Sequence, residues 1–432
     1  MKKVSISFMM LLLLVVLANC NKKEQVEVEF VKEVTPQIVQ ETEKEISPEE
    51  VQQFLKEFDS DSDSDMDYSI SEANNKLSVI LFKMLDKDNE NLIFSSFSIS
   101  NALAMTAETT NEEISNSIRS GLRLPNDTSI IRKGYQSILA NYGKENKEYA
   151  LNIANAVWVD KKYSLESERQ KNIEKYYLGQ AISFDNLQPV VTANQVNEWC
   201  DKKTNGMIKK IINAGDIHGR THLILTNAIY FKGSWEEEFQ VYNTSQRTFY
   251  NSAEQESQVD FMNINEKFAY TEDDNVQVLK MNYRGGDLSM IVILPRENDI
   301  RALKDSLKSE MLAKWNNNLD IYEVEVHFPK FKFDFDAELN EVLKKIGMDR
   351  AFVGKTADEL YIDKVLHRAI IDVNEAGTEA AAVTGVFMTD GMSPQYEKRK
   401  FIADHPFIFV IQDDRNQNIL FMGKVEYPVY KD

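Results

Sequence analysis

The chain is poor in the residue types that build disulfide scaffolds and metal centres. Its 432 residues include two cysteines, Cys20 and Cys200, and five histidines. Two cysteines allow at most one disulfide within the chain, which excludes the small disulfide-stapled folds. His218 and His222 have the four-residue spacing of a helical metal pair, but Gly219 and the strand pattern that follows argue against a helix there. We therefore expect no metal site. The other three histidines are His327, His367 and His405.

Motifs for turnover chemistry are also missing. No Gly-x-Ser-x-Gly elbow marks a nucleophile, and no glycine-rich loop could cradle a phosphate. We therefore expect a protein that is not an enzyme and that uses no cofactor.

Positive charge is scarce. With 50 basic and 69 acidic residues the formal net charge is −19, which argues against nucleic acid or an anionic membrane surface as the main partner. The imbalance is greatest in residues 21–67, which hold 15 acidic and 5 basic residues. We interpret this stretch as a solvated tether extended by charge repulsion, with a short helix over residues 48–58. The whole chain has 43% hydrophobic residues, which suits a soluble domain with a large core after residue 67.

Only one long hydrophobic run exists, and it lies at the N-terminus. Lys2 and Lys3 precede an apolar run over residues 4–17 that is short for a bilayer span and typical of a signal peptide. The run ends in Leu-Ala-Asn-Cys at 17–20, which resembles a bacterial lipobox and implies lipidation of Cys20. The alternative is an ordinary signal peptide cleaved nearby. We predict an exported lipoprotein of the bacterial cell envelope, at the outer membrane or cell surface.

If Cys20 is acylated, Cys200 has no partner and no disulfide can form. Cys200 follows Trp199 in a helical pattern, so we interpret it as a small core residue.

The end of the acidic tether has the spacing of a calcium loop. Carboxylates stand at the first, third, fifth, seventh and twelfth positions, but Met66 occupies the place of the turn glycine. A solvated acidic run is therefore favoured over a calcium site. The carboxylates are Asp61, Asp63, Asp65, Asp67 and Glu72.

From residue 68 the chain reads as one domain. Helical spacing of apolar residues occurs over 74–85, 164–177 and 190–204, and strand patterns occur over 222–230 and 288–294. A further succession from helix to strand covers residues 300–333. Helices and strands without regular βαβ alternation predict an α+β fold with large sheets. The predicted organisation is a signal peptide at 1–19, a lipidated Cys20 with its acidic tether at 20–67, and one domain at 68–432.

The segment 375–392, Glu-Ala-Gly-Thr-Glu-Ala-Ala-Ala-Val-Thr-Gly-Val-Phe-Met-Thr-Asp-Gly-Met, is the most informative in the chain. Every second residue from Thr378 to Met388 is small or apolar, so in an extended strand these side chains would share one face that a core could accept. Its Glu-Ala-Ala-Ala composition also favours a helix. The segment could therefore exist both as a loop and as a strand inside a sheet. The alternating positions are Thr378, Ala380, Ala382, Thr384, Val386 and Met388.

This segment resembles the hinge of the serpins, a family of serine-protease inhibitors. The resemblance is carried by Glu375, Gly377, Thr378, Ala380, Ala381, Ala382 and Thr384. Other stretches support it, in the order expected: Asn-Ala-Ile-Tyr-Phe-Lys-Gly-Ser-Trp at 227–235, Leu-Ser-Met-Ile-Val-Ile-Leu-Pro at 288–295, His-Phe-Pro-Lys-Phe at 327–331, His-Pro-Phe at 405–407 and Leu-Phe-Met-Gly at 420–423. Together they span residues 68–428.

The resemblance implies a serpin fold, with helices around large, mostly antiparallel sheets and an exposed reactive loop. It implies that a target endopeptidase cuts the loop and forms a covalent acyl complex, and that the loop then inserts into the main sheet. Glu375 and Lys330 resemble the charge pair at the base of the loop, with Trp235 beside it. Ser95, Ser98, Asn227 and His367 resemble the hydrogen-bond cluster at the middle of the sheet. We expect a monomeric chain.

The scissile bond is left open among three positions. Family loop lengths give Asp390, Gly391 or Met392, with Gly391 central, whereas side-chain chemistry favours Met392–Ser393 and an elastase-like or chymotrypsin-like target. Phe387 or Met388 would suit a cysteine protease. A trypsin-like target is disfavoured because the loop has no basic residue before Lys398.

Two other functions remain open. The domain could be a serpin fold without inhibitory activity that acts as a binding protein on the cell surface. Alternatively, it could serve as a scaffold for an acidic tether that binds calcium or a partner.

Overall fold

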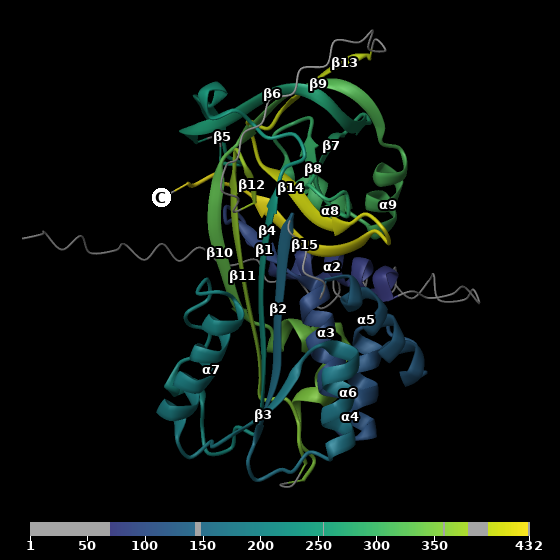
Figure 1. The fold of residues 1–432 in the computed structure, drawn as a ribbon, viewed down its shortest axis with the longest axis vertical. Helices are drawn as coiled ribbons and strands as arrows, with labels where there is room; N and C mark the ends of the chain where they lie inside the picture. Colours follow the sequence, from purple (N-terminus) through teal and green to yellow (C-terminus); the bar gives the residue numbers. More distant parts are fainter. Residues whose placement is uncertain (1–69, 143–147, 254, 357–358, 379–395, 431–432) are drawn as a thin grey trace, which may run out of the picture. The chain divides into compact units, whose positions relative to one another are not determined.

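A six-stranded sheet and a nine-stranded sheet form the framework of the chain (Figure 1). The structure is a computed structural model that describes residues 70–142, 148–253, 255–356, 359–378 and 396–430. The described residues fall within one compact unit, Glu45–Asp432. The predicted α+β class is confirmed.

The six-stranded sheet has the strand order β10-β11-β12-β4-β2-β3, and β11 also pairs directly with β4. The pairing of β11 with β4 is parallel, while both strands run antiparallel to the two-residue strand β12 that lies between them. We call the boundary between β4 and β11 the seam. Its upper end is where β4 and β11 finish, and its lower end is where they begin. The strands are β2 (Tyr149–Asp160), β3 (Gln180–Phe184), β4 (Leu223–Ser234), β10 (Phe331–Glu338), β11 (Lys364–Asn374) and β12 (Gly377–Thr378).

The nine-stranded sheet follows the order β1-β15-β14-β8-β7-β6-β9-β13, and β5 pairs with β6 outside this path. Strand β13 follows segment 375–392, which we call the reactive segment after its resemblance to the serpin loop, and pairs in parallel with β9. The strands are β1 (Leu92–Phe94), β5 (Ser245–Tyr250), β6 (Glu256–Glu272), β7 (Val276–Asn282), β8 (Leu288–Pro295), β9 (Asp320–Pro329), β13 (Lys398–Ile402), β14 (Phe407–Asp413) and β15 (Asn418–Val425).

Helices flank the sheets, and several begin where the sequence supplies a cap. Ser95 caps α3 through a bond from the Ser98 N–H, and Asn111 caps α4 ahead of two glutamates. The α-helices are α2 (Ile70–Leu85), α3 (Ser96–Ala107), α4 (Glu112–Gly121), α5 (Thr128–Tyr142), α6 (Ser167–Tyr177), α7 (Pro189–Lys203), α8 (Ile300–Ser306), α9 (Ser309–Asn317) and α10 (Asn340–Leu343). Short turns are η1 (Ala214–Asp216), η2 (Val241–Asn243), η3 (Lys344–Met348) and η4 (Asp349–Phe352).

These elements cover the helices and strands predicted from periodicity, with ends that differ by a few residues. Strand β4, for example, continues to Ser234 instead of ending at Tyr230. Helix α2 begins at Ile70, so Glu72 lies in its first turn, where its carboxylate pairs with Lys76 at 3.6 Å. The rest of the calcium-loop spacing, like the tether and the signal peptide, lies outside the described residues.

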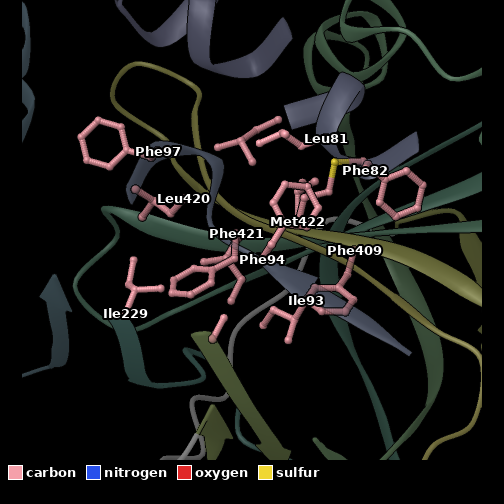
Figure 2. Packing of buried hydrophobic residues seen from close by; sticks show 14 of the residues in the cluster. Leu81, Phe82, Ile93, Phe94, Phe97, Ile229, Phe409, Leu420, Phe421 and Met422 are labelled. Carbon is pink, nitrogen blue, oxygen red and sulfur yellow. The ribbon is translucent and has the colours of Figure 1, made fainter. Parts of the chain in front are cut away.

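The main core lies between the two sheets and helix α2. Figure 2 shows Phe94, Phe97, Ile229, Phe409 and Phe421 packed from four strands and a helix. A smaller apolar layer lies between helix α7 and the other face of the six-stranded sheet, where Trp158 contacts Trp199 edge-on at 5.9 Å. One face of the six-stranded sheet is therefore covered by the main core and the other face is covered in part, so a strand that entered the sheet would need apolar or small side chains toward the main core. Among the described residues, no helix is long and apolar enough to cross a membrane.

Candidate functional site

The seam is partly open at its upper end. Strand β12 lies there, with Thr378 opposite Gly233 of β4 and Val373 of β11, and Gly377 opposite Ser234 and Asn374. Below it, β4 and β11 pair directly from Ile224 and Lys364 to Ile229 and Ala369. Gly377 and Thr378 thus already occupy a strand position between β4 and β11.

Gly377 is required at this position for steric reasons. Its φ of +147° lies outside the range that L-residues adopt readily, and a Cβ built on it would lie 2.1 Å from the carbonyl oxygen of Gly233. A larger residue would displace β12 from the seam.

The base of the reactive segment is fixed by a buried ion pair. The Glu375 carboxylate lies 3.0 Å from Lys330 Nζ and accepts a bond of 2.8 Å from Thr244 Oγ1, and its carbonyl accepts from the Phe239 N–H. Burial alone would raise the pKa of Glu375, but these bonds and the Lys330 charge hold it below its usual value. Glu375, just after β11, is therefore held by contacts with three other parts of the chain.

Trp235 covers this base together with a residue that the sequence did not single out. Its indole N–H donates to the carbonyl of Asn374 at 3.0 Å, and its ring stacks on Tyr283 at 4.6 Å. The Tyr283 hydroxyl lies 2.7 Å from Thr378 Oγ1. Tyr283 comes from a turn after β7 that no motif marks, so only the folded structure shows that it holds the first inserted side chain.

Halfway down the seam lies a buried polar cluster made of the predicted Ser95, Ser98, Asn227 and His367. His367 Nδ1 donates to Asn227 Oδ1 at 2.5 Å, and its Nε2 accepts from the Ser95 N–H at 3.3 Å. Burial lowers the pKa of His367 to about 3, so the ring is neutral at physiological pH. The bond from His367 to Asn227 joins β11 to β4 across the seam.

Asn155 of β2 is a further member that the sequence did not indicate. Its Oδ1 accepts from Asn227 Nδ2 at 2.5 Å and from Ser98 Oγ at 3.2 Å. An isolated Asn in an apolar strand pattern could have drawn attention, because a buried amide needs partners. The cluster thus links helix α3 with three strands.

A strap formed by residues 207–217, between α7 and β4, covers the lower half of the seam from outside. Ile212 and Ile217 belong to the same buried apolar cluster as Ile224 of β4 and Leu366 of β11. Arg368 of β11 donates to the carbonyl of Lys210 in the strap at 2.6 Å. These contacts must therefore break or shift when β4 and β11 separate.

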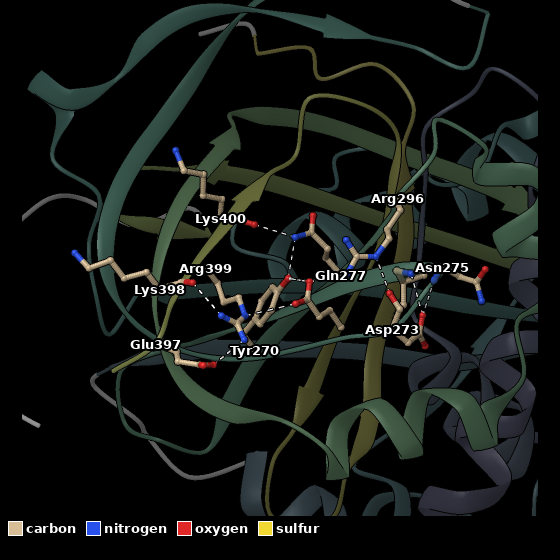
Figure 3. Close-up of polar contacts among 11 residues, drawn as sticks. Tyr270, Asp273, Asn275, Gln277, Arg296, Glu397, Lys398, Arg399 and Lys400 are labelled. Carbon is tan, nitrogen blue, oxygen red and sulfur yellow. Dashed lines mark hydrogen bonds and ion pairs between the residues drawn. The ribbon is translucent and has the colours of Figure 1, made fainter. Parts of the chain in front are cut away.

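The chain after the reactive segment is held by charge pairs. Figure 3 shows Lys398, Arg399 and Lys400 of β13 beside Tyr270 and Gln277. Lys398 lies 3.1 Å from Glu323, Lys400 lies 2.9 Å from Glu325 and Arg399 lies 2.8 Å from Glu397. These side chains line a hollow of about 640 Å³. Each cation already has a carboxylate partner, so the hollow has no free positive charge with which to bind an anion.

The remaining predicted site residues lie outside the described residues. They are Ala380, Ala381, Ala382, Thr384, the scissile candidates Asp390, Gly391, Met392 and Ser393, and Cys20. Cys200 is described: it is fully buried in α7, and burial raises the pKa of its thiol to about 12. In the part of the chain that the structure describes, no three His, Cys, Asp or Glu residues lie close enough to hold a metal ion.

Comparison with known proteins supports the same interpretation. A family model described as Serpin (serine protease inhibitor) matches residues 72–428. An uncharacterized serpin-like protein from Methanosarcina mazei is 36% identical over 87% of this chain and 92% of its own length. The leukocyte elastase inhibitor of Bos taurus is 34% identical over 83% of this chain and 99% of its own length. The crystal structure of the thermophilic serpin tengpin in the native state is 28% identical, covers 84% of this chain and 95% of its own, and has a TM-score of 0.76.

Proposed function

The chain belongs to the serpin family, and on that premise we propose that it is an irreversible suicide-substrate inhibitor of serine or cysteine endopeptidases. The target's nucleophile attacks the carbonyl before the scissile bond, the C–N bond breaks, and the new amine leaves with a proton from the target's histidine. The acyl-enzyme is then trapped as the loop enters the seam. Serpin loop insertion is a standard example of strand addition and of stored-strain release.

The observation that carries this proposal is the register of the seam. Thr378 lies opposite Gly233 and Val373, which differ by 140 in residue number. The directly paired part has the same offset, since Ile224 lies opposite Lys364. A longer strand can therefore enter as β4 and β11 move apart sideways, without either sliding along its axis.

Continuing both registers assigns each loop residue its neighbours. Thr378 is buried, and its hydroxyl contacts that of Tyr283. Loop residues with even numbers would face the main core as Thr378 does. Asn227 and His367 are the only pair of neighbours in which both side chains are polar. They would lie beside Thr384, the only polar side chain among the even-numbered residues from 380 to 388. The positions are Ala380 between Phe231 and Ile371, Ala382 between Ile229 and Ala369, Thr384 between Asn227 and His367, Val386 between Leu225 and Val365, and Met388 between Leu223 and Asp363.

The register also bears on the scissile bond. Strand β4 begins opposite Met388 and β11 begins opposite Phe387. Cleavage after Asp390, Gly391 or Met392 would leave enough chain to fill the seam and a short tail that carries the protease. We propose an elastase-like or chymotrypsin-like target cut in this range, because the three positions offer no basic side chain.

A direct test is to mix the protein with pancreatic elastase, chymotrypsin and subtilisin and to look for an SDS-stable complex. Mass spectrometry of the released C-terminal peptide then identifies the scissile bond. A non-inhibitory binding protein or a calcium-binding scaffold would be cut without forming a complex. Absence of a complex with every protease tried would overturn the proposal.

We predict that Thr384→Val weakens only the cleaved form. In that form Val would leave the buried Asn227 and His367 side chains without a partner across the seam, a loss of about 1–3 kcal/mol. In the native form the two residues bond to each other, so its stability should not change. Guanidinium melts of both forms measure this, with Thr389→Val, beyond the start of β11, as the matched control. Equal effects of the two substitutions would contradict the register.

We also propose that Cys20 is lipidated and anchors the protein to the cell envelope, supported by the lipobox-like sequence at 17–20. Cys20→Ser should move the protein from the membrane fraction to the soluble fraction of cells that express it, with inhibition unchanged. Unaltered fractionation would favour an ordinary signal peptide.

A further inference from the structure

The lower end of the seam is closed by one carboxylate. Asp363 precedes β11, and its Oδ2 accepts the N–H of His222 at 2.6 Å and that of Leu223 at 2.9 Å. Its own N–H donates to the Leu223 carbonyl at 2.9 Å. Three hydrogen bonds, two of them to a carboxylate oxygen, thus cross the seam within one residue.

Both sides of this contact are held by their own half of the sheet. The His222 ring lies 3.4 Å from Asp160 at the end of β2. On the other side, the Asp363 carbonyl accepts from Asn340 Nδ2 at 2.6 Å, and Asn340 Oδ1 accepts from the Val365 N–H at 2.9 Å. The bonds of Asp363 therefore join two parts of the sheet that are each fastened by further contacts, so these bonds must break if the two parts separate.

We propose that Asp363 is a clamp that keeps the seam shut at its far end and releases last during trapping. The inference rests on the proposed function. Insertion starts at Thr378, so the pairs nearest Ile229 and Ala369 separate first and the pair of Ile224 and Lys364 separates last. The clamp lies beyond that pair, opposite Met388 in the continued register. Asp363 is thus a positioning residue that governs the final step, not a group that reacts with the protease.

The clamp can stabilise only the native form. Neighbouring strands lie about 4.8 Å apart, so a strand between β4 and β11 separates them by about 9.6 Å, beyond hydrogen-bond reach. An ordinary structural residue would stabilise native and cleaved forms alike. A substitution that lowers the stability of the native form alone therefore indicates a clamp, whereas one that lowers the stability of both forms indicates an ordinary structural residue.

Asp372 provides a matched control on the same strand. It is also a buried aspartate, but it lies 2.9 Å from Lys332 of β10. We expect β10 and β11 to stay paired in both forms, because insertion would separate β11 from β4 and not from β10. We expect Asp363→Ala to lower the native melting midpoint by roughly 2–5 °C and to leave that of the loop-cleaved form unchanged. Asp372→Ala should lower both midpoints, the cleaved one by less, because Glu379 would lie beside Asp372 after insertion.

The second readout is kinetic. Asp363→Ala should lose inhibitory activity on storage roughly tenfold faster than the unchanged protein, because opening of the seam costs less. Asp363→Asn, which keeps an acceptor oxygen without the charge, should show a smaller effect and serves if the Ala variant does not fold. Equal losses in native and cleaved forms, or an unchanged native midpoint, would overturn the clamp. A protein that forms no complex with any protease and gains no stability on cleavage would instead refute the proposed function.

Discussion

Ala380→Arg should convert the inhibitor into a substrate. In the continued register Ala380 enters between Phe231 and Ile371, both of which are 2% exposed in the main core. A guanidinium without a partner there would cost several kcal/mol, enough to stall insertion near its start. Hydrolysis of the acyl-enzyme would then be faster than insertion of the loop. On a gel with an excess of the variant over protease, we expect cleaved protein, active protease and no SDS-stable complex.

The neighbouring position offers a matched control. Glu379 would lie between Lys232 and Asp372, on the face of the sheet turned away from the main core. Glu379→Arg places the same side chain in the same loop, one residue away, and should still trap protease. Full trapping by Ala380→Arg would mean that insertion along this face is not the trap. Loss of trapping in both variants would mean that the loop tolerates no arginine, and the register would not be supported.

Cleavage of the loop without a trapped protease should raise the melting midpoint by about 10–15 °C. Ten inserted residues would form hydrogen bonds to both neighbours, while the six direct pairs between β4 and β11 are lost. A net gain of roughly a dozen backbone bonds, at about 0.5–1.5 kcal/mol each, amounts to about 10 kcal/mol. With an unfolding entropy of about 2.1 cal/mol/K per residue over the domain, this gives the shift stated.

The measurement is a calorimetric melt before and after limited proteolysis by a protease that cuts within residues 387–393. Ala380→Arg, cut in the same way, is the control: it carries the same nick but cannot fill the seam, so its midpoint should stay near the native value. An unmoved midpoint in the unchanged protein would remove the thermodynamic basis of the trap.

The side chains of the hinge region show how far local sequence carries. Small residues at every second position indicate a strand that enters a core, whatever its surroundings, because the period of a strand is fixed by the backbone. The residues on either side of Gly377 likewise identify it as the glycine of the hinge. The predictions of an N-terminal signal and of an acidic tether also rest on composition alone, and both stay predictions. The sequence indicates each of these features without reference to a distant part of the chain, although the steric reason for Gly377 is its contact with Gly233.

The roles of Tyr283, Asn155 and Asp363 could not be assigned in this way. Each acts through a partner far away in the sequence: Tyr283 on Thr378, Asn155 on Asn227 and Asp363 on His222. Single tyrosine, asparagine and aspartate residues are common, and no spacing distinguishes these from others. Their roles appear only when strands from separate parts of the chain are aligned.

The sequence by itself predicted the family and the α+β class, which are confirmed, and a segment able to change from loop to strand, which stays a prediction. The tertiary structure decided where that segment would go: which face would be buried, which residues would become neighbours, and which contacts hold the seam closed until then. The physical reason is that periodicity is a property of one strand, whereas register arises from the pairing of several. A shift by one residue would turn every small side chain outward, and only the paired strands β4, β11 and β12 define that register.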